Sequence, residues 1–143
     1  MNTHQLTAAM ALVTALTFTN STWAQGVVVI VNESSPIASA DEAEVKRLYL
    51  GKTKEVSGTK VKPVNQSKAG AASAEFNQKV VGKSDSQLRA YWSKQVFTGK
   101  GKPPPEVDSD AEMLEKVASD PDAVGYVSAG SDTSGAKVVL TID

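Results

Sequence analysis

Five consecutive β-branched residues, Val27-Val28-Val29-Ile30-Val31, constrain the fold of this chain more than any other stretch. A strand that is apolar at every position has no face suited to water, so other elements must cover both of its faces. The polar segment Asn32-Glu33-Ser34-Ser35-Pro36 follows and is typical of a turn. The run therefore predicts a buried central strand in an α/β domain.

The segment after this turn has the pattern of an amphipathic helix. Ser39 and Glu42 have the spacing of a capping box, and Gly51 stands where a helix would end. The expected buried stripe consists of Val45, Leu48 and Tyr49. The first part of the chain thus predicts the order strand, loop, helix.

The stretch Val61–Phe76 predicts the same order a second time. Val61–Val64 is a short apolar run with a Pro that an edge strand tolerates, and a helix is expected over Ala69–Val81, closed by Gly82. Such a unit directs the free N–H groups of the first helical turn into the space beyond the strand, where an anion is favoured. The alternative is a plain strand-to-helix turn without a ligand.

The second half of the chain predicts two more helices and two more strands. Ser84 is the expected cap of a helix whose apolar residues include Tyr91 and Trp92, interpreted as packing residues. Gly99–Pro105 is a basic loop that turns into an extended segment, a candidate for a lid or a partner contact. The remaining expected elements are a helix over Asp110–Ala118, capped by Asp108 or Ser109, and strands over Ala123–Val127 and Lys137–Ile142.

The N-terminal part of the 143-residue chain has the features of an export signal. Leu6–Phe18 is an apolar run too short for a membrane anchor, and Thr22-Trp23-Ala24 ends in a small residue suited to signal peptidase. Residues 1–24 are therefore predicted to be a cleaved signal peptide and residues 25–143 a single domain. The chain has no Cys, so it has neither a lipid anchor nor disulfides, and a bacterial periplasmic location is expected.

Composition narrows the chemistry that residues 25–143 can perform. The only His is His4, so the mature chain lacks the residues of nucleophilic triads and of imidazole or thiolate zinc sites. The pairs Asp108/Asp110 and Asp120/Asp122 are explained by helix capping and turn chemistry. The chain is predicted not to be an enzyme and to hold no cofactor, and its pI near 5.8 argues against nucleic-acid binding.

Charges of opposite sign occupy different parts of the sequence. Residues 46–102 contain 13 Lys or Arg and three acidic residues, whereas most of the other acidic residues follow residue 102. One interpretation is a surface with a basic part and an acidic part. The other is that the two segments are neighbours in the fold and neutralise each other.

Several stretches resemble type II periplasmic solute-binding proteins, in particular the substrate-binding proteins of phosphate ABC transporters. The similar residues come in the family's order: Val27–Val31, Arg47–Lys52, Val61–Asn65, Phe97–Gly101 and Asp120–Val127. The resemblance implies an α/β fold that is one lobe of a periplasmic-binding-protein-like fold, three-layered, with a small mixed sheet flanked by helices. It also implies that an inorganic oxyanion, phosphate or similar, binds at the strand-loop-helix over residues 61–76.

At the anion-binding loop itself, the sequence departs from the pattern of the family. Asn65 stands where the family has an Arg that grips the oxyanion, and Lys68 stands where it has an Asp. Gly70-Ala71-Ala72 replaces the family's Ser-Gly-Thr, so its hydroxyl groups are missing. The predicted anion-binding residues are Asn65, Ser67, Lys68, Gly70 and Ala71, with Ser34 and Ser35 from the neighbouring strand-end loop.

Two functions remain open from the sequence. Family members are two lobes that close on the ligand, whereas residues 25–143 suffice for one lobe. A solute-binding role would therefore need a self-dimer or a protein partner to supply the other wall. The alternative is a periplasmic interaction or sensor-accessory protein, which keeps the lobe as a scaffold for a periplasmic or membrane protein and binds no anion tightly.

Overall fold

The computed structural model describes residues 26–143, so the predicted signal peptide lies outside the described residues. The helices are α1 (Glu42–Tyr49), α2 (Ser73–Phe76), the π-helix η1 (Asn77–Val81), α3 (Asp85–Phe97) and α4 (Asp110–Ser119). The longer strands are β1 (Val27–Asn32), β7 (Ala123–Ser128) and β8 (Ala136–Ile142). The two-residue strands are β2 (Glu55–Val56), β3 (Thr59–Lys60), β4 (Lys62–Pro63), β5 (Asn65–Gln66) and β6 (Glu106–Val107).

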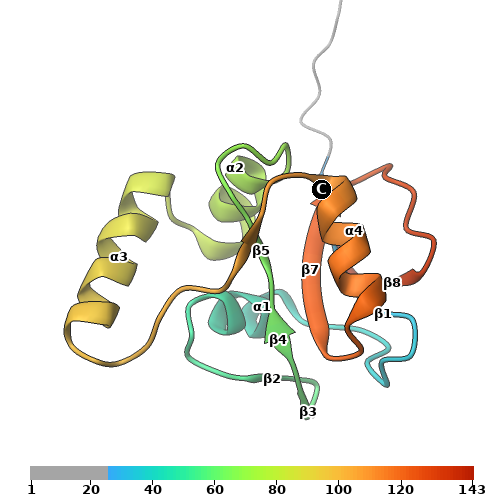
Figure 1. The fold of residues 1–143 in the computed structure, drawn as a ribbon, viewed down its shortest axis with the longest axis horizontal. Coiled ribbons are helices and arrows are strands. Elements are labelled where there is room, and N and C mark those ends of the chain that lie inside the picture. Colours follow the sequence, from blue (N-terminus) through green and yellow to red (C-terminus); the bar gives the residue numbers. More distant parts are fainter. Residues whose placement is uncertain (1–25) are drawn as a thin grey trace, which may run out of the picture.

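The central sheet has the strand order β4-β7-β1-β8. β1 is antiparallel to both of its neighbours, and β4 is parallel to β7, so the sheet is mixed. All six residues of β1 are buried, as the unbroken β-branched run predicts. Figure 1 shows α4 lying across the part of the sheet in which β1 runs beside β7.

Helices cover both faces of the sheet and produce two cores. On one face, Val27, Val29 and Val31 pack with residues of α1, α2 and η1. On the other face, Val28 and Ile30 pack with residues of α4. Burying one such side chain contributes about 1.5–3 kcal/mol. The predicted three-layer α/β architecture is therefore confirmed.

Three aromatic side chains join the first core to the start of the 65–71 loop. The rings of Phe76 and Tyr126 stack with centroids 3.7 Å apart, and Tyr49 meets Phe76 edge-on at 4.8 Å. The Tyr49 hydroxyl donates to the carbonyl of Val64 at 2.8 Å, immediately before β5. This cluster fixes where the chain leaves the sheet.

Two helices begin later than the sequence pattern predicts. α1 is capped by Asp41 with Glu44, not by Ser39 with Glu42, so the same type of capping box is shifted by two residues. The helix expected from Ala69 begins at Ser73, because the chain first makes a turn in which the N–H of Gly70 donates to the carbonyl of Ser67. Its end is as expected, with Gly82 in the left-handed conformation at φ 72°.

α3 lies at one end of the molecule, away from the sheet (Figure 1). Leu88, Tyr91 and Trp92 are only half-buried, and the Tyr91 hydroxyl donates to the carbonyl of Leu50 at 2.6 Å. Val96 and Phe97 are 55% and 92% exposed. Tyr91 is thus a packing residue, as predicted, whereas Trp92 also borders two grooves. Nothing in the described part of the chain covers the last turn of the helix. Within residues 26–143, no helix is long and apolar enough to cross a bilayer.

Candidate functional site

The 65–71 loop starts from a small parallel ladder beside the main sheet. β5 pairs with β6, and the N–H of Ser67 donates to the carbonyl of Val107 at 2.8 Å. The Ser67 hydroxyl donates to Asp108 Oδ1 at 2.6 Å, and its oxygen accepts from the N–H of Ala69 at 3.3 Å. The loop is therefore held against the segment that leads into α4.

Gln66 is the buried support of this loop. Its Nε2 donates to Asp110 Oδ1 at 2.7 Å and to the carbonyl of Tyr126 at 2.9 Å, which ties the loop to α4 and β7. Its Oε1 is buried and has no hydrogen-bond partner among residues 26–143. Gly70 packs directly on this side chain, and a Cβ at that position would overlap Gln66. The loop therefore requires glycine at position 70 for close approach.

Asn65 and Lys68 border a groove of about 640 Å³ between the loop and α3, which we term the loop groove. Asn65 Oδ1 accepts from the Tyr126 hydroxyl and from the N–H of Gln66, so its Nδ2 remains available as a donor. Lys68 is exposed and takes part in no ion pair among the described residues. Ser67, Gly70 and Ala71 belong to the same loop, but the N–H of Gly70 is already used within its turn.

Ser34 and Ser35 lie at the opposite end of the sheet. β1 runs antiparallel to β7 whereas β4 runs parallel to it, so the loop after β1 and the loop after β5 leave in opposite directions (Figure 1). Ser35 has other contacts there, since its carbonyl accepts from Lys137 Nζ at 2.7 Å. The expectation that this loop neighbours the 65–71 loop is therefore wrong, because strand direction was inferred without the pairing partner.

Two residues that the sequence analysis missed line the same groove. Ser73 and Asn77 are polar, buried, and four residues apart in the continuous α2 and η1 segment. The Ser73 hydroxyl donates to the carbonyl of Gln66 at 3.2 Å, which joins the helix start to the loop. Their spacing of four residues, which places both on one face of a helix, is a signal that could have identified them. Arg89 of α3 reaches the groove from the other wall and pairs with Asp85 at 3.4 Å.

Acidic residues lie close to this set of donors. Glu106 borders the groove, while Asp108 and Asp110 bond the loop through Ser67 and Gln66. Burial raises the pKa of Tyr126 to about 12; hydrogen bonds with Gln66 and Ser73 lower it, and the charges of Glu106 and Asp110 add to the increase. The loop therefore combines hydrogen-bond donors for an anion with a negative field that weakens its binding.

The acidic pairs considered for catalysis have structural partners. Asp110 accepts from Gln66 and from the N–H of Ser128 at 3.3 Å, and Asp120 accepts from the N–H of Asp122 at 3.0 Å. Within residues 26–143, no cluster of three or more His, Cys, Asp or Glu side chains has the arrangement of a metal site. The groups that the loop groove offers a ligand are the side-chain amides of Asn65 and Asn77 and the charge of Lys68.

Solved structures with similar folds come from phosphate transport. An ABC-type phosphate transport receptor from Vibrio cholerae matches with a TM-score of 0.61 at 18% identity, over 80% of this chain and 45% of that chain. A putative phosphate ABC transporter substrate-binding protein with bound phosphate, from Clostridium perfringens, matches with a TM-score of 0.61 at 16% identity, over 80% and 44%. The chain has the fold of one lobe of a phosphate-transport binding protein.

A third structure of the same kind gives the same extent of match. PstS from Borrelia burgdorferi has a TM-score of 0.59 at 13% identity, over 80% of this chain and 46% of that chain. The chain therefore spans less than half the length of these binding-protein structures. No model of a known protein family matches the sequence, and no curated protein matches it either. At these identities the likeness concerns the fold.

Proposed function

We propose that this chain is a periplasmic solute-binding protein of the phosphate ABC transporter type, which binds an oxyanion in the loop groove. The observation that carries the proposal is the convergence of Asn65, Lys68, Ser73 and Asn77 on one groove at a strand-loop-helix junction. The groove lies in a fold that is shared with solved structures named as a phosphate transport receptor and as a phosphate transporter substrate-binding protein. We further propose that residues 1–24 are removed on export to the periplasm.

Three of these residues, Asn65, Lys68 and Asn77, offer a group that suits an oxyanion. Lys68 supplies a positive charge, and Asn65 supplies its free Nδ2 group. Ala71 contributes an N–H that has no acceptor within residues 26–143. Asn77 adds a side-chain amide from the helix, whereas the Ser73 hydroxyl donates to the Gln66 carbonyl and so holds the loop against the helix. Ser67 orients the loop through Asp108, and Gly70 allows the loop to approach Gln66.

The proposed binding is weak for an isolated lobe. The groove is open to solvent, where a single charge or N–H contact contributes only ~1 kcal/mol. The nearby Glu106 and Asp108 further reduce the affinity for a doubly charged anion. A second wall, from another copy of the chain or from a protein partner, would exclude water and strengthen every contact.

Calorimetric titration of the purified chain with inorganic phosphate and with sulfate tests the proposal. We expect a millimolar dissociation constant that Lys68→Ala weakens about threefold to tenfold, corresponding to the loss of ~1 kcal/mol. Lys60→Ala is the matched control, because Lys60 is an exposed lysine that borders none of the grooves. Absence of heat at millimolar phosphate and sulfate would contradict anion binding. Mass spectrometry of the exported chain tests for an N-terminus at Gln25.

A second function is favoured by one observation, the exposed apolar end of α3. Phe97 is 92% exposed and Val96 is 55% exposed, which is unusual for neighbouring apolar residues in a folded domain. In this alternative the lobe is a scaffold that docks on an envelope protein and binds no anion tightly. Recovery of an envelope protein by the wild-type chain and its loss with Phe97→Ser would support docking. Equal recovery with both chains would exclude this end of α3 as the contact.

A further inference from the structure

Five lysines from four segments of the chain border a second groove, of about 710 Å³, which we term the lysine groove. These are Lys54 before β2, Lys62 in β4, Lys100 and Lys102 after α3, and Lys116 in α4. The lysine groove shares Trp92 and Pro103 with the loop groove but none of the loop residues from Asn65 to Ala71. It is therefore a separate site, which the proposed oxyanion binding does not use.

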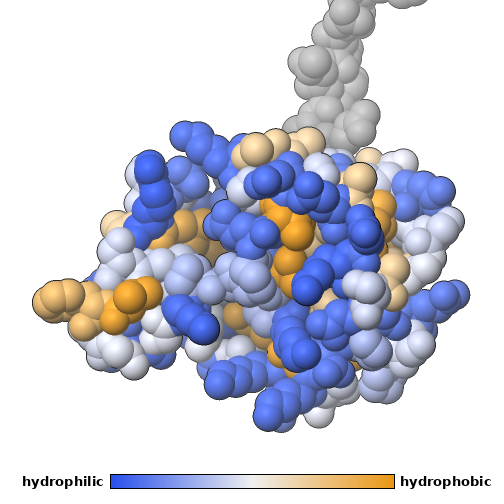
Figure 2. All heavy atoms as spheres, in the orientation of Figure 1, coloured by the Kyte–Doolittle hydropathy of each residue, from blue (hydrophilic) through white to orange (hydrophobic). Residues whose placement is uncertain are grey.

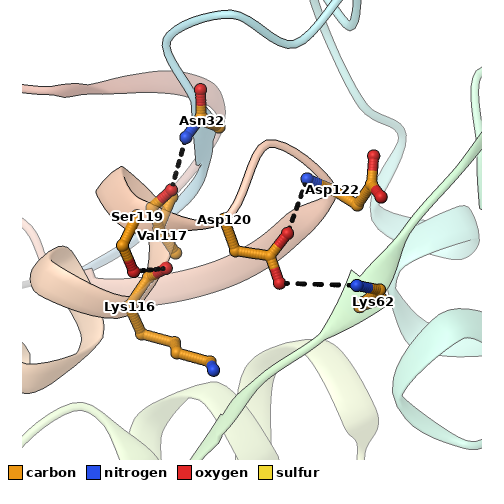
Figure 3. A network of polar contacts seen from close by, with 7 residues as sticks. All are labelled: Asn32, Lys62, Lys116, Val117, Ser119, Asp120 and Asp122. Atoms are coloured by element: carbon orange, nitrogen blue, oxygen red, sulfur yellow. Dashed lines mark hydrogen bonds and ion pairs between the residues drawn. The ribbon is translucent and has the colours of Figure 1, made fainter.

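The lysine groove has little compensating negative charge. Asp120 is the one acidic residue among those that border it. Asp120 Oδ2 lies 3.7 Å from Lys62 Nζ, and Asp120 Oδ1 accepts from the N–H of Asp122, so both carboxylate oxygens are engaged (Figure 3). In the same view the Lys116 ammonium extends from α4 without a drawn partner. At neutral pH the groove thus carries an excess of four positive charges.

The fold brings these charges together although the sequence separates them. Lys54, Lys62, Lys100 and Lys102 belong to the basic middle of the chain, and Lys116 comes from the acidic C-terminal part. Around this groove the acidic segment neutralises the basic one only in part, through the pair of Asp120 with Lys62. Figure 2 shows hydrophilic side chains interspersed with apolar patches over the main body, and an apolar end where α3 finishes.

The walls of the lysine groove define what kind of ligand it can take. Its volume is in the range of ~300–1,000 Å³ that is typical of small-molecule sites, and it is hollowed rather than flat. Pro103–Pro105 forms one border and offers no N–H donors, and apolar side chains such as Val61 and Trp92 form others. Thr53 and Gln95 add neutral polar groups, so the positive charge of the groove comes from the lysine ammonium groups alone. Lysine binds phosphate as a compact point charge. Several such charges from different directions suit a ligand with several separate anionic groups.

We propose that the lysine groove binds a soluble anion that carries several phosphate groups, of the inorganic oligophosphate class. One orthophosphate ion can neutralise only part of an excess of four charges. A chain of linked phosphates can contact lysines from α4, β4 and the segment after α3 at the same time. The site selects by the number of linked charges, whereas the loop groove selects a single oxyanion by hydrogen bonds.

The test is a calorimetric titration of the purified chain with tripolyphosphate at low salt. We expect one tripolyphosphate per chain, and at equal concentration orthophosphate should bind this groove at least about tenfold more weakly, because it presents fewer charges. The double variant Lys100→Glu/Lys102→Glu should weaken tripolyphosphate binding by at least about tenfold. Both lysines are exposed, so the fold should be unaffected.

Three further variants separate the site from general charge effects and from the proposed oxyanion site. Lys46→Glu/Lys60→Glu changes the net charge equally at exposed positions that border none of the grooves, and it should leave the binding nearly unchanged. Lys54→Ala/Lys116→Ala acts from other elements and should weaken the binding. Lys68→Ala should leave tripolyphosphate binding intact, which distinguishes this site from the proposed oxyanion site.

Three outcomes would overturn the inference. The first is no tripolyphosphate binding at low salt. The second is equal weakening by the groove variants and by the Lys46→Glu/Lys60→Glu control, which would indicate unspecific attraction. The third is binding to vesicles containing phosphatidylglycerol without binding to tripolyphosphate, which would assign these lysines to a lipid surface instead.

Discussion

The central sheet with the helices that cover its two faces, here called the body, differs from the segment over residues 85–105 in how many apolar side chains are exposed. In the body, both faces of β1 are sealed by helices, and the rings of Phe76 and Tyr126 stack inside the core. In the 85–105 segment, no residue of α3 is fully buried, and Phe97 is almost completely exposed. Both proposed binding grooves lie where this segment meets the body. The body supplies the stability, and its junction with residues 85–105 supplies the binding surfaces.

The largest effect is expected in the aromatic centre of the body. Phe76→Ala removes a fully buried ring that stacks on Tyr126 and meets Tyr49. We expect a loss of about 3–5 kcal/mol in the free energy of unfolding, measured by urea denaturation. A loss below ~1 kcal/mol would show that this cluster does not hold the body together.

A pH effect of somewhat smaller size is expected from the same cluster. Burial raises the pKa of Tyr126 to about 12 and the pKa of Tyr49 well above its usual value, so the unfolded chain loses these protons first. The stability they contribute is complete below pH ~10 and is lost as the pH rises towards ~12.

The size of this effect follows from the shift at Tyr126 alone. A shift of about two units corresponds to about 2–3 kcal/mol, to be measured as a falling urea midpoint between pH ~10 and ~12. Tyr126→Phe should reduce the slope in this range. An unchanged slope in that variant would contradict the assignment to Tyr126.

Gly70→Ala is expected to have an intermediate effect at the boundary between body and loop groove. The added Cβ overlaps the Gln66 side chain, so the loop or Gln66 must move. We expect a loss of about 1–3 kcal/mol by urea denaturation and weaker phosphate binding. Gly101→Ala is the matched control, because nothing lies within 4 Å of its added Cβ. Equal stability of the two variants would refute the close packing on Gln66.

The smallest effect is expected at the end of α3. Phe97→Ser removes an apolar side chain that is 92% exposed, so the free energy of unfolding should change by less than ~0.5 kcal/mol. Its contrast with Phe76→Ala measures the difference between the two regions directly. A loss above ~1 kcal/mol would indicate that the chain itself covers Phe97 in solution.

The sequence predicts the body better than it predicts the site. The apolar run of β1 and the spacing of Met113 and Val117 in α4 depend on local periodicity, and both give the observed burial. Such burial can be predicted because the period of a strand or helix determines which of its own residues face the core.

The predictions that are wrong at the site concern contacts between elements that are far apart in the sequence. The start of α2 depends on Gly70 lying on Gln66, a contact that spacing does not reveal. The position of Ser34 and Ser35 depends on β1 being antiparallel to β7, and strand direction cannot be read from an apolar run. The lysine groove arises from elements far apart in the sequence, so no single stretch indicates it.

The most direct test of the account is an NMR titration of the purified chain with inorganic phosphate. The account predicts shifts of the backbone amides from Ser67 to Ala71 and of the side-chain amides of Asn65 and Asn77, with Lys100 and Lys102 unaffected. Unchanged loop amides at millimolar phosphate, or shifts confined to the lysine groove, would contradict it.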